Sequence, residues 1–200
     1  KLAMLETTAK ETGTSSDYIT KKWGSINSVL GDSGAAVEGL NNLMAAGLKT
    51  EKELDSVISS LEGASIKFKD TLKFEGLSDG LQETLATGQL IGPFGELFER
   101  SGINIDIFNE KLKATTEPAK RQQMILSQLS KLGLGEFSKS YREANKEMLA
   151  NEDAVSKTTA IWAGYADAFL PISTQLRESF NGMLTGIQPF IVAIAQKVPA

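Results

Sequence analysis

The sequence predicts an all-α protein in which short helices with glycine stops precede long, kinked amphipathic helices that self-associate as a coiled coil or bundle. Three observations predict this fold class. Helix-favouring residues dominate the 200-residue chain, and aromatic residues make up only 7% of it. Apolar residues recur at intervals of three and four along most of the sequence. The chain is 41% hydrophobic and 23% charged, which is typical of a folded protein with one sizeable core or two small ones.

The distribution of charge predicts three regions. The chain carries 21 basic and 25 acidic residues, yet after residue 158 the charged residues are Asp167, Arg177, Glu178 and Lys197 alone. We expect short Ala/Gly/Ser-rich helices over 1–74, a charged helical region over 75–158 and an apolar long-helix segment over 159–200. The chain starts at Lys1 and ends in an apolar stretch, so we expect a fragment of a longer polypeptide.

In the first region, apolar stripes at helical spacing end at glycines. One stripe, ended by Gly31, consists of Ile19, Trp23, Ile26 and Leu30, and the next consists of Val37, Leu40, Leu43, Met44 and Leu48. Thr50 and Glu53 form a predicted capping box. The helix that follows carries Leu54, Val57, Ile58 and Leu61, and we expect it to close at Gly63.

The second region has comparable signals. Ser78 is a candidate cap for a helix that carries Leu81 and Leu85 and stops at Gly88. Pro93 suits the first turn of a helix that carries Phe94, Leu97 and Phe98 and is followed by Gly102. Asn104 is expected to begin a helix, although the alternation in "GINIDIF" leaves a strand open. Thr116 is expected to cap a helix with Pro118 in its first turn, Ile125, Leu129 and Leu132 on one face, and Gly133 at its end. The last stripe is Phe137, Tyr141, Ala144 and Met148.

The third region has the most regular periodicity, a stripe with steps of three and four residues. Its members are Trp162, Tyr165, Phe169, Ile172, Leu176, Phe180, Met183, Ile187, Phe190 and Ile194. The mean step lies between the roughly 3.5 residues of a coiled coil and the roughly 3.6 of a straight helix. We therefore expect a self-association seam, with helix kinks at Pro171 and Pro189.

The glycine-rich stretch "GQLIGPFGELFERSG", residues 88–102, raises the alternative of a phosphate-binding loop. Such a loop needs a preceding strand and a Lys-Ser or Lys-Thr pair after it, and neither is present. Pro93 also lacks the N–H that a phosphate cradle uses. We therefore interpret the stretch as a boundary between helices.

The composition argues against an enzyme. The chain has no Cys and no His, which removes thiolate and imidazole chemistry. The carboxylate pairs Glu96 with Glu99 and Glu152 with Asp153 are expected on solvated helix faces. Ser127, Ser130, Ser138 and Ser140 match no nucleophile pattern and are expected on helix surfaces. We predict no catalytic, cofactor-binding or metal-binding residues.

Residues 74–190 resemble the tail tape measure proteins of long-tailed bacteriophages. The resemblance lies in an order of phrases: "GPFGELFERSGI", "FNEKL", "KRQQMIL" and "LGLGEF", then "YREANKEMLANEDA", then the run "YADAFLPISTQLRESFNGMLTGIQPFI". It implies a helical virion protein, packed in the tail tube lumen or tail tip, that sets tail length during assembly in the host cytoplasm. It also implies ejection ahead of the DNA and, in some phages, a part in forming a path through the host envelope.

The resemblance implies several partners as well. It suggests a homo-oligomer, most often a trimer, that contacts tail tube, tail tip and tail assembly chaperone proteins. The net charge of −4 offers no attraction for DNA phosphates, so specific nucleic-acid binding is not expected. The alternative function is a membrane-active helical protein that forms or lines a path through the host envelope. Its basis is the uncharged stretch from Ser179 to Gln196, which is close to the minimum length of a spanning helix.

Overall fold

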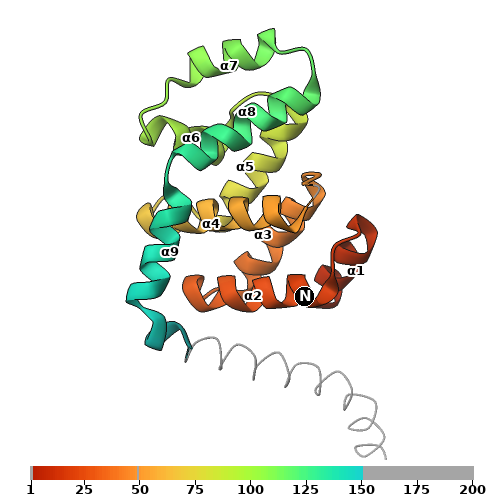
Figure 1. The fold of residues 1–200 in the computed structure, drawn as a ribbon, viewed down its shortest axis with the longest axis vertical. Helices are drawn as coiled ribbons and strands as arrows, with labels where there is room; N and C mark the ends of the chain where they lie inside the picture. The colour runs from red at the N-terminus through yellow and green to blue at the C-terminus, as the bar shows by residue number, and fades with distance from the viewer. Residues whose placement is uncertain (1, 49, 151–200) are drawn as a thin grey trace, which may run out of the picture. The chain divides into compact units, whose positions relative to one another are not determined.

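A computed structural model describes residues 2–48 and 50–150, and these residues are almost entirely helical (Figure 1). No strand occurs among them, which confirms the predicted all-α class. The helices are α1 (Leu2–Thr12), α2 (Ser16–Leu30), α3 (Ser33–Ala45), α4 (Glu51–Lys67), α5 (Phe74–Thr87), α6 (Gly92–Arg100), α7 (Ile105–Ala114), α8 (Pro118–Lys131) and α9 (Leu134–Ala144). A further helical turn begins at Lys146.

Several predicted helix boundaries are confirmed. Gly31 ends α2 and Gly88 ends α5, and both have the left-handed conformation, with φ of 68° and 71°. The capping box before α4 is present, with Thr50 and Glu53 each accepting the backbone N–H of the other. Asn104 caps α7 by accepting the N–H of Ile107, so "GINIDIF" enters a helix and is not a strand.

Three predicted boundaries are wrong. Helix α4 does not close at Gly63 but continues to Lys67, and Gly63 is instead the point at which α9 passes too closely for a side chain. Ser78 lies inside α5 and not at its start, and its hydroxyl donates to the Phe74 carbonyl at 2.7 Å. The cap residue of α8 is Glu117 and not Thr116, because Pro118 takes the first helical position.

The core forms where helices approach through small residues. A Cβ on Gly39 of α3 would lie 2.4 Å from the ring of Phe74, and one on Gly80 of α5 would lie 2.9 Å from the Cβ of Phe94. The Phe74 ring therefore lies directly on the backbone of α3, and the start of α6 at Phe94 lies directly on the backbone of α5. The largest fully buried side chains are Phe74, Phe94, Phe98, Leu5, Ile19, Ile26, Leu40, Leu43, Leu61, Leu72, Leu77 and Leu81.

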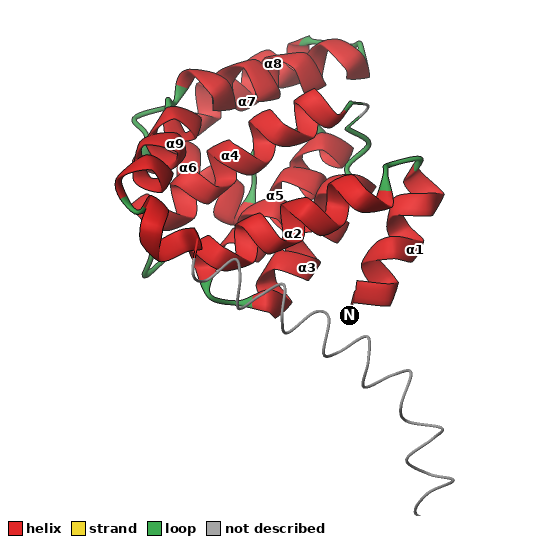
Figure 2. Ribbon diagram, turned by 60° about the horizontal axis from the view of Figure 1, so that its bottom comes forward, coloured by secondary structure: helices red, strands yellow, loops and turns green. Residues whose placement is uncertain are grey.

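Contacts cross the expected boundary at residues 74 and 75. Helix α3 packs against α5, and α4 packs against α9, so the first two predicted regions share one compact unit, Lys1–Ser156. Figure 2 shows the described part of this unit from a second direction, with short loops between its helices. The 159–200 region, including the predicted seam and kinks, lies outside the described residues.

The last predicted stripe of the second region is wrong. Phe137 and Met148 are exposed, at 41% and 50% of their surface, and Ala144 is exposed as well. The buried side chains of this part of the chain are instead Leu134, Ser138 and Leu149. The buried position between Leu134 and Leu149 holds the small side chain of Ser138, because α9 lies very close to the backbone of α4.

Candidate functional site

Glu62 is the most unusual polar residue in the described part of the chain. It lies within the second half of α4, and its side chain is only 1% exposed. A carboxylate is almost never buried without a charged or hydrogen-bonding partner, because the loss of hydration costs several kcal/mol. The surroundings of Glu62 therefore define the candidate site.

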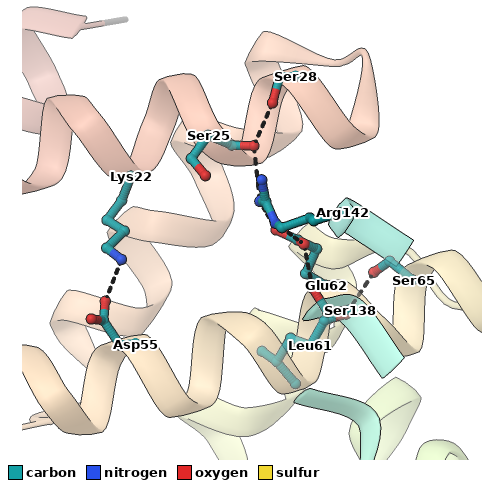
Figure 3. Close-up of polar contacts among 9 residues, drawn as sticks. All are labelled: Lys22, Ser25, Ser28, Asp55, Leu61, Glu62, Ser65, Ser138 and Arg142. Atoms are coloured by element: carbon teal, nitrogen blue, oxygen red, sulfur yellow. Dashed lines mark hydrogen bonds and ion pairs between the residues drawn. The ribbon is translucent and has the colours of Figure 1, made fainter. Parts of the chain in front are cut away.

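Two residues of α9 bind the Glu62 carboxylate (Figure 3). The Ser138 hydroxyl donates to Oε1 at 2.5 Å, and Arg142 Nε donates to the same oxygen at 2.7 Å. Arg142 Nη2 donates to Oε2, and it also donates to the Ser25 carbonyl of α2 at 3.0 Å. One guanidinium thus links α2, α4 and α9.

The local sequence explains this geometry. Ser138 and Arg142 are four residues apart on α9, so both side chains lie on the same helical face. Next to Glu62, Gly63 has no side chain, and a Cβ there would lie 2.0 Å from the Leu134 carbonyl oxygen. Gly135 of α9 lies in turn over Ser60, with its Cβ position 3.6 Å from Oγ. Small residues on both helices therefore bring α9 close enough for its polar side chains to reach Glu62.

A second polar cluster joins α2 to the first half of α4. Lys22 Nζ lies 2.6 Å from Asp55 Oδ1, and the Tyr18 hydroxyl donates to that oxygen at 2.5 Å. Tyr18 also donates to the Glu51 carbonyl at 3.1 Å. Burial, and then the hydrogen bond to Asp55, raise the pKa of the Tyr18 phenol well above its ordinary value. This cluster is more exposed than the Glu62 pair, with 47% of the Asp55 side chain accessible.

A groove of about 660 Å³ runs over α4 and α9 between these two clusters. Its charged lining residues have both signs and consist of Asp55, Glu136, Glu143, Lys139, Arg142 and Lys146. Serines supply much of the remaining polar surface, and no side chain there is an imidazole or a thiol. The arrangement can hold helices together: the Ser138 hydroxyl is bonded to the Glu62 carboxylate, but both side chains are buried and Arg142 holds the same carboxylate.

Residues 2–48 and 50–150 contain neither a cluster of metal ligands nor a helix suited to cross a membrane. Within these ranges, no three Asp or Glu side chains are grouped as metal ligands would be. Within the same ranges, no helix combines the length and the apolar character that crossing a membrane requires.

The structure places the other sequence candidates as follows. The glycine-rich stretch ends α5 and forms α6, with Phe94 and Phe98 fully buried. Glu96 is half-exposed and paired with Arg100 at 2.6 Å, and Glu99 is exposed. Glu152 and Asp153 lie outside the described residues, as do all ten seam residues and both kink prolines.

The prediction that Ser138 lies on a helix surface is wrong, because this residue is only 2% exposed. The sequence analysis also did not identify Glu62 or Arg142 as site residues. A signal was present in "ISSLEGAS", residues 58–65, where one acidic residue stands among small residues on a buried helical face. Small residues at that spacing indicate a close helix contact, and an acidic residue within such a contact requires a cationic partner.

Comparison of the chain with protein-family models, with curated proteins and with solved structures gave no match.

Proposed function

We propose that the chain is a segment of a tail tape measure protein of a long-tailed bacteriophage, a structural component of the virion without catalytic activity. The observation that carries the proposal is the order of sequence phrases between residues 74 and 190. The fold supports it, because the phrases from "GPFGELFERSGI" to "LGLGEF" lie in four consecutive helices, α6 to α9. In this role the chain contributes to tail length during assembly and leaves the tube ahead of the DNA.

The folded unit has a size that matters for this role. About 150 residues in a compact unit have a radius of gyration of about 15 Å, and so a diameter of about 40 Å. The same residues as one continuous helix would span about 225 Å. The buried core of residues 2–150 favours the compact form in the assembled tail.

The predicted seam supplies the self-association that the proposal requires. The full 200-residue chain is expected to form a homo-oligomer, with a trimer as the first expectation. Phe180→Asp would place a charge in the seam and is expected to shift the chain to monomer in sedimentation-velocity runs. Ser179→Asp, next to the seam, is the matched control and should leave the oligomer intact. A wild-type chain that sediments as a monomer at all concentrations would contradict this part of the proposal.

The function itself is tested on purified tailed particles of the virus that encodes the chain. Mass spectrometry is expected to detect the chain in DNA-filled particles and to find it depleted after triggered DNA ejection. Tail tube subunits serve as the internal control, because they remain in the particle in both states. Absence of the chain from filled, tailed particles would rule out a tape measure role.

A second candidate function is membrane activity during infection. The low charge of residues 159–200, together with Trp162 and Tyr165, is its motivation, since such aromatic residues favour the interface of a bilayer. The full chain is then expected to release dye from anionic lipid vesicles, and Phe169→Asp is expected to abolish the release. No binding of the wild-type chain to such vesicles at any pH would exclude this candidate.

A further inference from the structure

Helix α9 is attached to the rest of the unit differently from the other helices. Its most extensive contacts are with α4, and its buried side chains are Leu134 and Ser138. The α4 residues that it contacts include Ser60, Gly63 and the Glu62 carboxylate. Apart from Leu134 and the half-buried Tyr141, which lies near Ile66, the residues named at this interface are small or polar, unlike the large apolar side chains that hold α5 and α6 in the core.

The polar contacts of this interface can be replaced by water if α9 moves away as a whole. The three hydrogen bonds to Glu62 all come from Ser138 and Arg142, which lie on α9. Helix α9 also covers Glu62, because Leu134 and Ser138 lie against the adjacent Gly63. Departure of α9 thus removes the counter-charge and admits water in the same step, so no buried charge remains unpaired.

The connection between α8 and α9 provides a pivot. Gly133 is in the left-handed conformation, with φ of 69°, and nothing lies within 4 Å of the position that a Cβ would take. On its other side, α8 is fixed by the buried Ile125 and Leu129. A change in the Gly133 dihedral angles therefore swings α9 without displacing the core.

We propose that α9 is a detachable strap, which opens reversibly from α4 about Gly133 while α1 to α8 remain folded. This property belongs to the folded unit and does not depend on the proposed function. If that function holds, the strap is the point at which a chain stored in folded form begins to unfold when it is drawn out of the tail.

Hydrogen–deuterium exchange on the full 200-residue chain tests the proposal. Backbone amides of α9 are expected to exchange on the order of ten-fold faster than those of α4 and α5, because they exchange through local opening. Two variants should move the α9 rate in opposite directions. Arg142→Met leaves Glu62 buried without its cation in the closed state, and should accelerate α9 exchange by about 100-fold.

The triple variant E62L/S138A/R142L replaces the polar contacts with apolar ones and should slow α9 exchange relative to the wild type. Arg100→Met is the matched control, because it breaks an exposed ion pair on α6 and should leave α9 unchanged. If α4 and α9 exchange at the same rate in the wild type, α9 opens only with the whole unit and the strap is refuted. The same conclusion follows if the triple variant leaves α9 exchange as fast as in the wild type.

Discussion

Gly63→Ala is the smallest change that tests the close contact between α4 and α9. The new Cβ would lie 2.0 Å from the carbonyl oxygen of Leu134 and 2.8 Å from its carbonyl carbon. Ordinary contacts begin at 3.4 Å, so α9 must move away by about 1.4 Å. Both obstructing atoms belong to the backbone, and no side-chain rotation relieves the clash.

The movement has a calculable effect on the Glu62 site. The bonds from Ser138 and Arg142 Nε, now 2.5 and 2.7 Å long, would be stretched beyond hydrogen-bonding distance. Loss of one or two hydrogen bonds to a charged group costs about 1.5–3 kcal/mol each, and alanine returns about 1 kcal/mol of helix propensity. With both bonds lost, we expect a net loss of about 2–5 kcal/mol in the free energy of unfolding.

Urea denaturation followed by tryptophan fluorescence provides the assay. A Trp162→Phe background leaves the buried Trp23 as the single tryptophan. The matched control is Gly76→Ala in α5, whose Cβ would lie 3.7 Å from Pro93 Cγ, an ordinary contact. This control should gain up to about 1 kcal/mol. If Gly63→Ala is as stable as the control, the described approach of α9 to α4 is incorrect.

Three further predictions concern the rest of the unit. Phe98→Ala removes a fully buried ring that contacts Phe94 and Phe108, and should cost about 3–5 kcal/mol in urea denaturation. Arg100→Met should change stability by less than about 0.5 kcal/mol, and a larger loss would show that its pair with Glu96 is not solvent-screened as described. The raised pKa of Tyr18 means that the folded state holds the phenol proton more tightly, so stability should fall as pH rises through the ordinary value of 10.0. Tyr18→Phe should flatten that decline, and an unchanged decline would exclude Tyr18 as its cause.

Much of the fold was predictable because helix ends depend on local chemistry. Gly31, Gly88, Asn104 and the Thr50–Glu53 pair act within one turn of the chain, so their roles can be recognised without tertiary information. The apolar stripes were also predictable, and their members Ile19, Leu40 and Leu61 are fully buried. The spacing of apolar residues identifies the face of a helix that is buried against other helices.

The candidate site was not predictable because it depends on which helices meet. Glu62 and Arg142 are 80 residues apart, and no local pattern pairs α4 with α9. Gly63 was interpreted as a helix stop because glycine often ends helices, whereas here it permits a close crossing. The predicted stripe that starts at Phe137 is not the buried face of α9. Helix α9 meets α4 through small and polar residues, and hydrophobic periodicity cannot detect such a face.

Tail length after an in-frame deletion of residues 1–150 tests the central proposal most directly. Electron microscopy of particles that carry the shortened protein is expected to show tails shorter by about 40 Å, the diameter of the compact unit. A loss of about 225 Å would retain the length-setting role but contradict the compact form, because it equals the length of one extended helix. Tails of unchanged length would contradict the proposal that this segment contributes to the measured length.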